Sequence, residues 1–86
     1  MDRQVDLQLL RTKMRAGKMP VSPKHRLFGG PGDGTPCACC DRIITRYEMA
    51  FEVECLVSGT LVVLAMHTRC FDAWIAEARA ASPGTG

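Results

Sequence analysis

The sequence lacks any long apolar run. Its longest uninterrupted aliphatic stretch covers residues 61–66, whereas a membrane-spanning helix needs about 20 apolar residues. Charged and amide side chains interrupt the first ten residues, so these do not match the apolar core of a secretory signal. A chain of 86 residues has room for one small domain, whose core alone leaves little stability to spare. We therefore expect one cytoplasmic domain that does not bind membranes.

Core-forming side chains are missing from two segments. Residues 29–36 read Gly-Gly-Pro-Gly-Asp-Gly-Thr-Pro, and residues 82–86 read Ser-Pro-Gly-Thr-Gly. Such compositions bury too little apolar surface to order themselves. The glycine-rich stretch also lacks the Lys-Ser/Thr pair of a phosphate-binding loop. We expect a linker at 29–36 and a disordered tail at 82–86.

The N-terminal segment combines an apolar stripe with basic charge. Residues 3–16 are predicted to form a helix that Asp2 caps and Gly17 ends, with Leu7, Leu10 and Met14 on one face. Residues 1–26 contain seven basic and two acidic side chains, a net charge of +5, while the rest of the chain has a net charge of −3. Residues 1–28 are therefore expected to be an N-terminal helix and a basic extended arm.

The C-terminal half contains two strand patterns followed by a helix pattern. Residues 47–55 alternate apolar and polar side chains, residues 60–66 are rich in β-branched and aliphatic side chains, and Ser58-Gly59 between them is a turn signal. This predicts an antiparallel hairpin whose second strand is apolar on both faces, so that its outer face meets the N-terminal helix or a partner. From Thr68 to about Ala81, apolar side chains recur every three or four residues, which predicts an amphipathic helix.

Five cysteines are the main chemical feature of the sequence. An odd number fits a secreted disulfide framework poorly, because one thiol is left over. In a reducing cytoplasm, clustered cysteines indicate metal or redox chemistry. The cysteines therefore indicate how so small a domain gains stability.

Two residue pairs have the spacing of metal ligands. Cys37 and Cys40 are three residues apart, and so are His67 and Cys70. Zinc favours four tetrahedral ligands drawn from thiolate sulfur and imidazole nitrogen, and the predicted hairpin brings the two pairs together. The spacing predicts one structural Zn²⁺ ion bound by these four residues, although the ligand types also permit iron.

The remaining cysteines and His25 are not expected to bind the metal. Cys39 is adjacent to Cys40 and would chelate poorly together with it. Cys55 ends a strand on its apolar face, where a buried cysteine behaves as a small apolar residue. His25 lies in a basic extended segment and is expected to be exposed. Phe71 and Trp74 are expected to be core residues that pack over the metal site.

The order of these elements resembles the treble-clef zinc fingers. The residues on which this resemblance rests are Cys37-x2-Cys40 and His67-x2-Cys70, at the two ends of the predicted hairpin. The resemblance covers residues 37–79. The pattern also resembles one half of a LIM-type module, with a longer spacer, and short, largely uncharacterised bacterial zinc-binding proteins. The resemblance implies a small α+β zinc-stabilised domain, treble-clef-like, at 37–81: a zinc knuckle, an antiparallel β-hairpin and a C-terminal helix, with an additional N-terminal helix.

An enzyme is not expected. Four protein ligands leave no open position for substrate. The zinc deaminase signature requires His-x-Glu upstream, whereas His25 is followed by Arg26 and Leu27. A dithiol redox pair lies at the start of a helix in a βαβ unit, whereas Cys37 and Cys40 precede the predicted hairpin.

Two binding functions remain open. The first is a protein-interaction or regulatory adaptor that binds a protein partner or itself through the N-terminal helix and the apolar second strand. The alternative is nucleic-acid binding through the basic arm, against which stands the acidic charge of the finger itself. No small-molecule substrate is expected.

Overall fold

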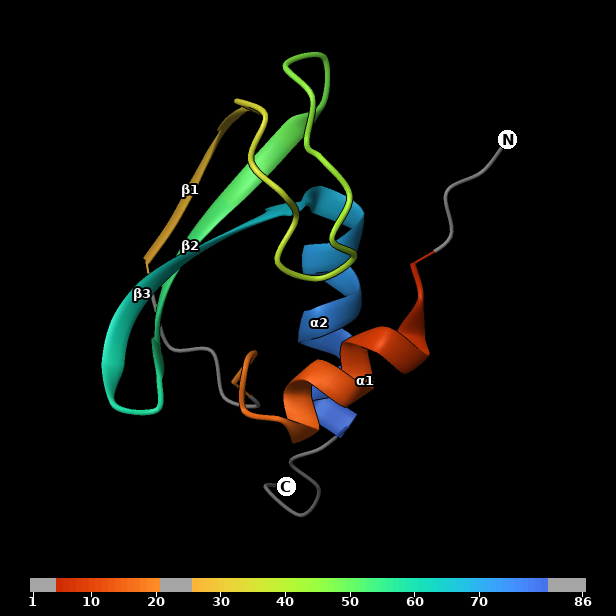
Figure 1. Ribbon diagram of the computed structural model, residues 1–86, viewed down its shortest axis with the longest axis vertical. Coiled ribbons are helices and arrows are strands. Elements are labelled where there is room, and N and C mark those ends of the chain that lie inside the picture. Colours follow the sequence, from red (N-terminus) through yellow and green to blue (C-terminus); the bar gives the residue numbers. More distant parts are fainter. Residues whose placement is uncertain (1–4, 21–25, 81–86) are drawn as a thin grey trace.

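A computed structural model describes residues 5–20 and 26–80 of the chain. It is a small α+β domain with the element order α1 (Leu7–Arg15), β1 (Arg26–Pro31), β2 (Met49–Val57), β3 (Thr60–His67) and α2 (Thr68–Ala80). The strands form one antiparallel sheet in the order β1-β2-β3. Helix α2 contacts β2 and β3, and α1 contacts α2 (Figure 1). Neither described helix is long and apolar enough to cross a membrane.

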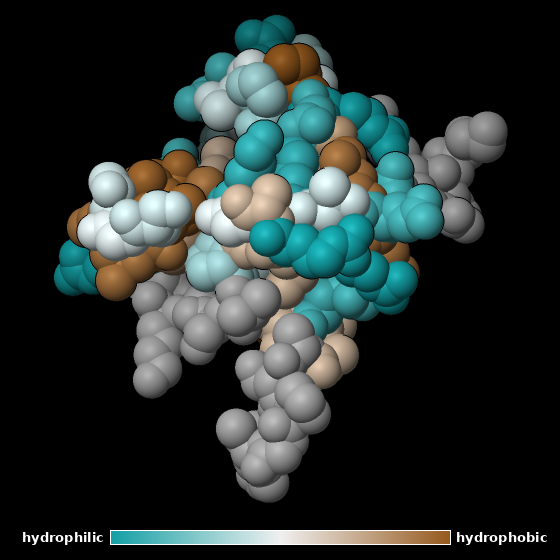
Figure 2. Space-filling model, turned by 60° about the horizontal axis from the view of Figure 1, so that its bottom comes forward, coloured by the Kyte–Doolittle hydropathy of each residue, from teal (hydrophilic) through white to brown (hydrophobic). Residues whose placement is uncertain are grey.

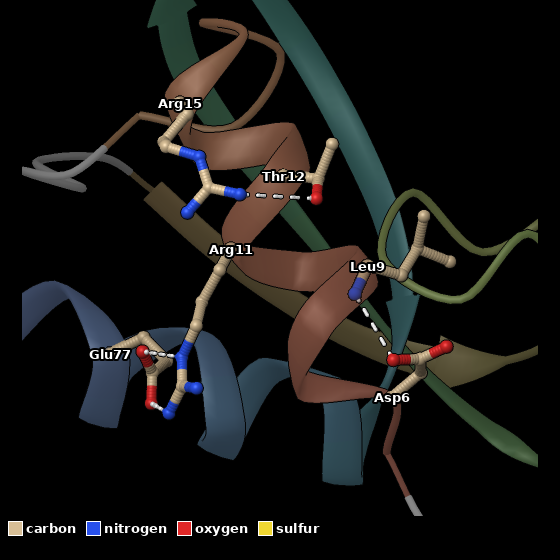
Figure 3. Close-up of polar contacts among 6 residues, drawn as sticks. All are labelled: Asp6, Leu9, Arg11, Thr12, Arg15 and Glu77. Carbon is tan, nitrogen blue, oxygen red and sulfur yellow. Dashed lines mark hydrogen bonds and ion pairs between the residues drawn. The ribbon is translucent and has the colours of Figure 1, made fainter.

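Helix α1 begins later than the sequence suggested. Val5 and Asp6 are not helical, and the Asp6 carboxylate accepts a hydrogen bond from the Leu9 amide at 3.1 Å (Figure 3). Asp6 is thus the N-cap, because an acidic side chain there satisfies an amide without an intrahelical partner. The expected start at residue 3 is therefore wrong, and the expected cap Asp2 lies outside the described residues.

The end of α1 matches its prediction. Gly17 has φ +79°, its amide donates to the Met14 carbonyl, and the Lys18 amide donates to the Lys13 carbonyl. These two bonds form a Schellman motif, in which glycine adopts the left-handed conformation at no steric cost. The chain is thereby turned so that Met19 is buried against the core.

Strand β1 corrects one expectation. Gly29, Gly30 and Pro31, the first part of the expected linker, are its second half and pair with residues 49–51 of β2. Glycine and proline disfavour strands, but β1 is an edge strand, where the missing proline amide is tolerated. The Cβ that alanine would place at Gly29 would lie 3.5 Å from the Phe51 ring, an ordinary van der Waals distance, so the ring packs against the strand at this position.

The predicted hairpin is confirmed, with β2 shifted by two residues. Ser58 and Gly59 form the two-residue turn with φ of +51° and +82°, as hairpin turns of this length require. Tyr47, expected on the apolar face, lies in the preceding turn and is 84% exposed. Helix α1 does not contact β3, so it does not cover the outer face of the hairpin.

The core lies between the sheet and the two helices. Trp74 of α2 and Leu10 of α1 are fully buried, and the Trp74 indole donates to the Pro20 carbonyl at 2.8 Å. Phe71 makes edge-to-face contacts with Phe51 of β2, at a centroid distance of 5.0 Å, and with Trp74, at 6.1 Å. Trp74 is thus a core residue and the partly buried Phe71 packs against the core, so that the two connect the sheet to α2; their packing over the metal site stays a prediction.

A surface ion pair also joins the two helices. The Arg11 guanidinium donates to both carboxylate oxygens of Glu77, at 2.8 and 3.1 Å (Figure 3). This hydrogen bond raises the pKa of Arg11 and lowers the pKa of Glu77. Because the pair is solvent-exposed, it contributes little to stability.

Candidate metal centre

The first ligand pair lies in a tight turn between β1 and β2. Residues on either side of the turn pair as a short ladder, in which the Cys37 amide donates to the Arg42 carbonyl at 2.8 Å. Within the turn, the Asp41 amide donates to the Cys37 carbonyl, and the Cys40 amide points at Cys37 Sγ at 3.5 Å. Asp41 has φ +68°, a left-handed conformation that aspartate tolerates. This closed turn, residues 37–41, is called the knuckle below.

The second ligand pair lies where β3 passes directly into α2. His67 is the last residue of β3, and Cys70 lies in the first turn of α2. No loop separates β3 from α2, so His67 and Cys70 lie only three residues apart, less than one helical turn. Both side chains therefore face the knuckle. A backbone bond from the Ala38 amide to the Ala65 carbonyl, at 2.7 Å, attaches the knuckle to β3.

These four residues form one compact cluster. One ligand atom from each of Cys37, Cys40, His67 and Cys70 lies within 4.8 Å of every other. A tetrahedral ion with Zn–S bonds of about 2.3 Å separates its ligand atoms by about 3.8 Å, so the cluster needs only a small contraction to hold a metal. Cys37 and Cys70 are buried, while Cys40 and His67 are partly buried. The predicted ligand set is therefore brought together in the fold.

Burial and mutual contacts keep the thiols of the cluster protonated in the absence of metal. The hydrogen bond with Cys70, followed by burial, raises the pKa of Cys37 to about 12. The bond with Cys37 lowers the pKa of Cys70, but its contact with Cys39, its burial and the nearby cysteine charges together raise it to about 12. Burial raises the pKa of Cys40. The metal-free thiols are thus neutral at neutral pH, and a bound metal must displace their protons.

Lys13 connects α1 to the knuckle. Its ammonium donates to the Ala38 carbonyl at 2.8 Å and to the Asp41 carboxylate at 2.6 Å. The Lys13 side chain is only 13% exposed, whereas that of Asp41 is 67% exposed. Three thiolates and one imidazole around a divalent ion would carry a net charge of −1, which the Lys13 ammonium, although paired with Asp41, would partly offset.

The other candidates are placed outside the ligand set. Cys39 and Cys55 are buried, and neither belongs to the four-residue cluster. The bystander interpretation of both is consistent with this placement, although Cys39 touches the site through its contact with Cys70. His25 lies outside the described residues.

Two residues that the sequence did not single out support the site. Gly32 fits against the backbone of residues 44–45, where an added Cβ would lie 2.2 Å from the Thr45 carbonyl oxygen. Glu48 lies 3.4 Å from the imidazole of His67. Thr45-x-x-Glu48 has the capping-box spacing, a signal that could have indicated an ordered Glu48 side chain.

Comparison with known proteins adds no relative to this description. The chain matches no protein-family model, no curated protein and no solved structure. The interpretation of the site therefore rests on its own residues and geometry.

Proposed function

We propose that this chain is a treble-clef zinc finger in which Cys37, Cys40, His67 and Cys70 hold one structural Zn²⁺ ion. The observation that carries the proposal is the convergence of four ligand atoms within 4.8 Å from two segments 27 residues apart. The order of knuckle, hairpin and helix matches that of a treble clef. Three cysteines and one histidine are an established ligand set of structural zinc.

Energetics favour a structural role. Zinc binding to small finger peptides is worth about 10–16 kcal/mol at pH 7, and this becomes folding free energy because the unfolded chain has no preformed site. A whole domain has a stability of about 5–15 kcal/mol. With all four positions filled by protein, the ion has no vacant position for a substrate, so we assign the protein no enzymatic activity.

Cobalt substitution tests the ligand set. Co²⁺ in a tetrahedral site of three thiolates and one imidazole gives intense visible absorption, which stoichiometric Zn²⁺ then displaces. We expect one equivalent of Co²⁺ to give this spectrum in the wild type and in Cys55→Ser, and the spectrum to be lost in Cys40→Ser. A wild type without the tetrahedral spectrum would overturn the proposal.

We further propose that the finger acts in protein interaction, through the outer face of the hairpin. Three apolar side chains of the hairpin, Leu56, Leu61 and Val63, are half or more exposed on this face, and Phe28 of β1 lies on the same face beyond Glu52 and Glu54 of β2. Leu56 and Leu61 lie opposite each other on neighbouring strands. Apolar side chains gather over the hairpin at the left of Figure 2.

The free edge of β3 supports a second copy as the partner. Alternate residues of an antiparallel strand point their backbone groups to the same side, and Ala65 directs its carbonyl away from β2 to the knuckle. Leu61 and Val63 share this orientation, and they make no backbone bond on that side within residues 5–20 and 26–80. Strand β3 contains no charge and no proline, the features that usually block pairing between strand edges.

Light scattering after size-exclusion chromatography tests this association. We expect a concentration-dependent dimer for the wild type and for Ala76→Lys on the exposed face of α2, and a monomer for Val63→Lys. A zinc-loaded wild type that stays monomeric at all concentrations would contradict self-association while leaving the metal site intact.

Nucleic-acid binding is the weaker alternative. Arg11 and Lys13, two of the basic residues of the N-terminal segment, contact Glu77 and Asp41 within the domain. Less of the basic charge is therefore available for phosphates. We expect no retention of mixed-sequence DNA or RNA in a low-salt gel shift, and a salt-dependent shift would reverse this preference.

A further inference from the structure

The imidazole of His67 presents its two nitrogens to different surroundings. Nδ1 lies 3.4 Å from Cys40 Sγ, on the side of the ligand cluster. Nε2 lies 3.4 Å from Glu48 Oε1. Nε2 is buried and makes no hydrogen bond of good geometry to the residues that the structure describes. The ring is therefore oriented with Nδ1 toward the metal position and Nε2 toward a carboxylate.

A local turn fixes the Glu48 carboxylate at this place. Its Oε1 accepts a hydrogen bond from the Thr45 amide at 2.9 Å, and the Glu48 amide donates to the Thr45 carbonyl at 3.0 Å. The Glu48 carbonyl accepts from the Gly32 amide at 2.9 Å. The side chain is 29% exposed. Both the backbone and the carboxylate of Glu48 are thus held before any metal binds.

From this geometry we infer that Glu48 is a positioning residue for the metal site: its carboxylate accepts a hydrogen bond from the Nε2–H of His67 and so keeps the ring proton on Nε2 and leaves Nδ1 free as the ligand. The inference rests on the proposed zinc site. A neutral imidazole carries its proton on one nitrogen only, and the hydrogen bond of that nitrogen selects the tautomer that binds metal. The distance of 3.4 Å between His67 Nε2 and Glu48 Oε1 is slightly beyond the usual N–H···O range of 2.7–3.2 Å. A small rotation of the imidazole ring completes this hydrogen bond.

The test compares zinc affinities by competition with a chromophoric chelator. Removal of an outer-shell partner typically costs about 10- to 100-fold in metal affinity, and we expect a loss of this size for Glu48→Ala. Glu48→Gln keeps an oxygen that can accept a hydrogen bond from Nε2–H, so its loss of affinity should be smaller. Glu52→Ala, which removes an exposed carboxylate from β2, is the matched control and should leave the affinity unchanged.

A second background separates positioning from a purely structural role of the Thr45–Glu48 turn. In His67→Cys the site has four cysteines, an established zinc ligand set, and no imidazole to position. We expect Glu48→Ala to cause no loss of zinc affinity there. An equal loss in both backgrounds would mean that Glu48 acts only through the turn and would overturn the inference.

The tautomer gives a readout that does not depend on affinity. In the zinc-loaded wild type, ¹⁵N–¹H correlation spectra of the His67 ring should show the proton on Nε2 and the metal on Nδ1. Ligation through Nε2 would overturn the inference alone, because the zinc site would still exist. A wild type that binds no zinc would instead overturn the proposed function.

Discussion

The two ends of the sheet differ in how the fold stabilises them. At the end near His67, the knuckle and the start of α2 bury Cys37, Ile44 and Met66 to 1% exposure or less. At the hairpin end, Leu56 and Leu61 remain 60% and 65% exposed. The buried end contains the knuckle, which has little regular structure, and the exposed end contains a regular hairpin. Regular backbone pairing orders the hairpin end, whereas the end near His67 brings four potential metal ligands together, and we propose that a bound metal stabilises it.

The largest expected effect comes from removing a ligand at the metal end. Cys70→Ser or Cys40→Ser should lose much of the roughly 10–16 kcal/mol that zinc supplies to folding, and the C-terminal half should unfold. Cys55→Ser, at a position as buried as Cys70 but outside the cluster, should cost about 1–3 kcal/mol for burying a hydroxyl, and Cys39→Ser should also be mild. Circular dichroism and metal content measure the ranking, and equal behaviour of all four variants would refute the ligand assignment.

The next effect comes from the glycines of the segment before the knuckle. Gly32→Ala places a Cβ 2.2 Å from the Thr45 carbonyl oxygen and 2.5 Å from that of Ile44. Both contacts are with backbone, so we expect a loss of about 1–3 kcal/mol in the free energy of unfolding from overpacking. Gly30→Ala meets no atom within 4 Å and is the control. If thermal denaturation shows equal stability for the two variants, the close contact at Gly32 is not important.

A smaller effect is expected where α1 is joined to the knuckle. Lys13→Met keeps the aliphatic stem but removes the bonds to Ala38 and Asp41. Hydrogen bonds with charged groups contribute about 1.5–3 kcal/mol, and the exposure of Asp41 places this one at the low end. Lys18→Met, at an exposed position, should be neutral. Chemical denaturation of zinc-loaded protein compares the two, and a neutral Lys13→Met would show that α1 docks through its apolar side chains alone.

The smallest effect is expected at the exposed Arg11–Glu77 pair. Arg11→Gln should lower the melting temperature slightly at low salt, and the difference should disappear at high salt because exposed pairs are screened. The hydrogen bond with Arg11 lowers the pKa of Glu77 in the folded protein. The contribution of the ion pair to stability is therefore present above the unfolded pKa of Glu77 and is lost as the pH falls through its folded pKa. A difference that persists at high salt would indicate a packing role for the arginine stem.

The sequence alone predicted the hairpin, α2 and the four residues that the fold brings together as potential metal ligands, because each has a local pattern. The spacing of Cys37, Cys40, His67 and Cys70 and the Ser58-Gly59 turn are readable without tertiary information. Local patterns fail where a segment takes its structure from contacts with another element. Gly29 and Gly30 have poor strand propensity, and they pair because β2 offers an edge.

Contacts between distant residues account for the remaining differences. The roles of Lys13 and Glu48 depend on neighbours 25 and 19 residues away, which no helical or strand period reveals. Two aspartates precede α1, and the sequence pattern favours Asp2 as the cap, whereas the helix begins after Asp6, whose carboxylate caps it. Local patterns alone do not tell which of two possible caps a helix uses.

Native mass spectrometry of the purified protein, combined with circular dichroism before and after exhaustive chelation, tests the central claim most directly. The account predicts one zinc ion per chain and loss of the native spectrum when that ion is removed. A chain without stoichiometric metal that keeps its native spectrum after chelation would contradict it.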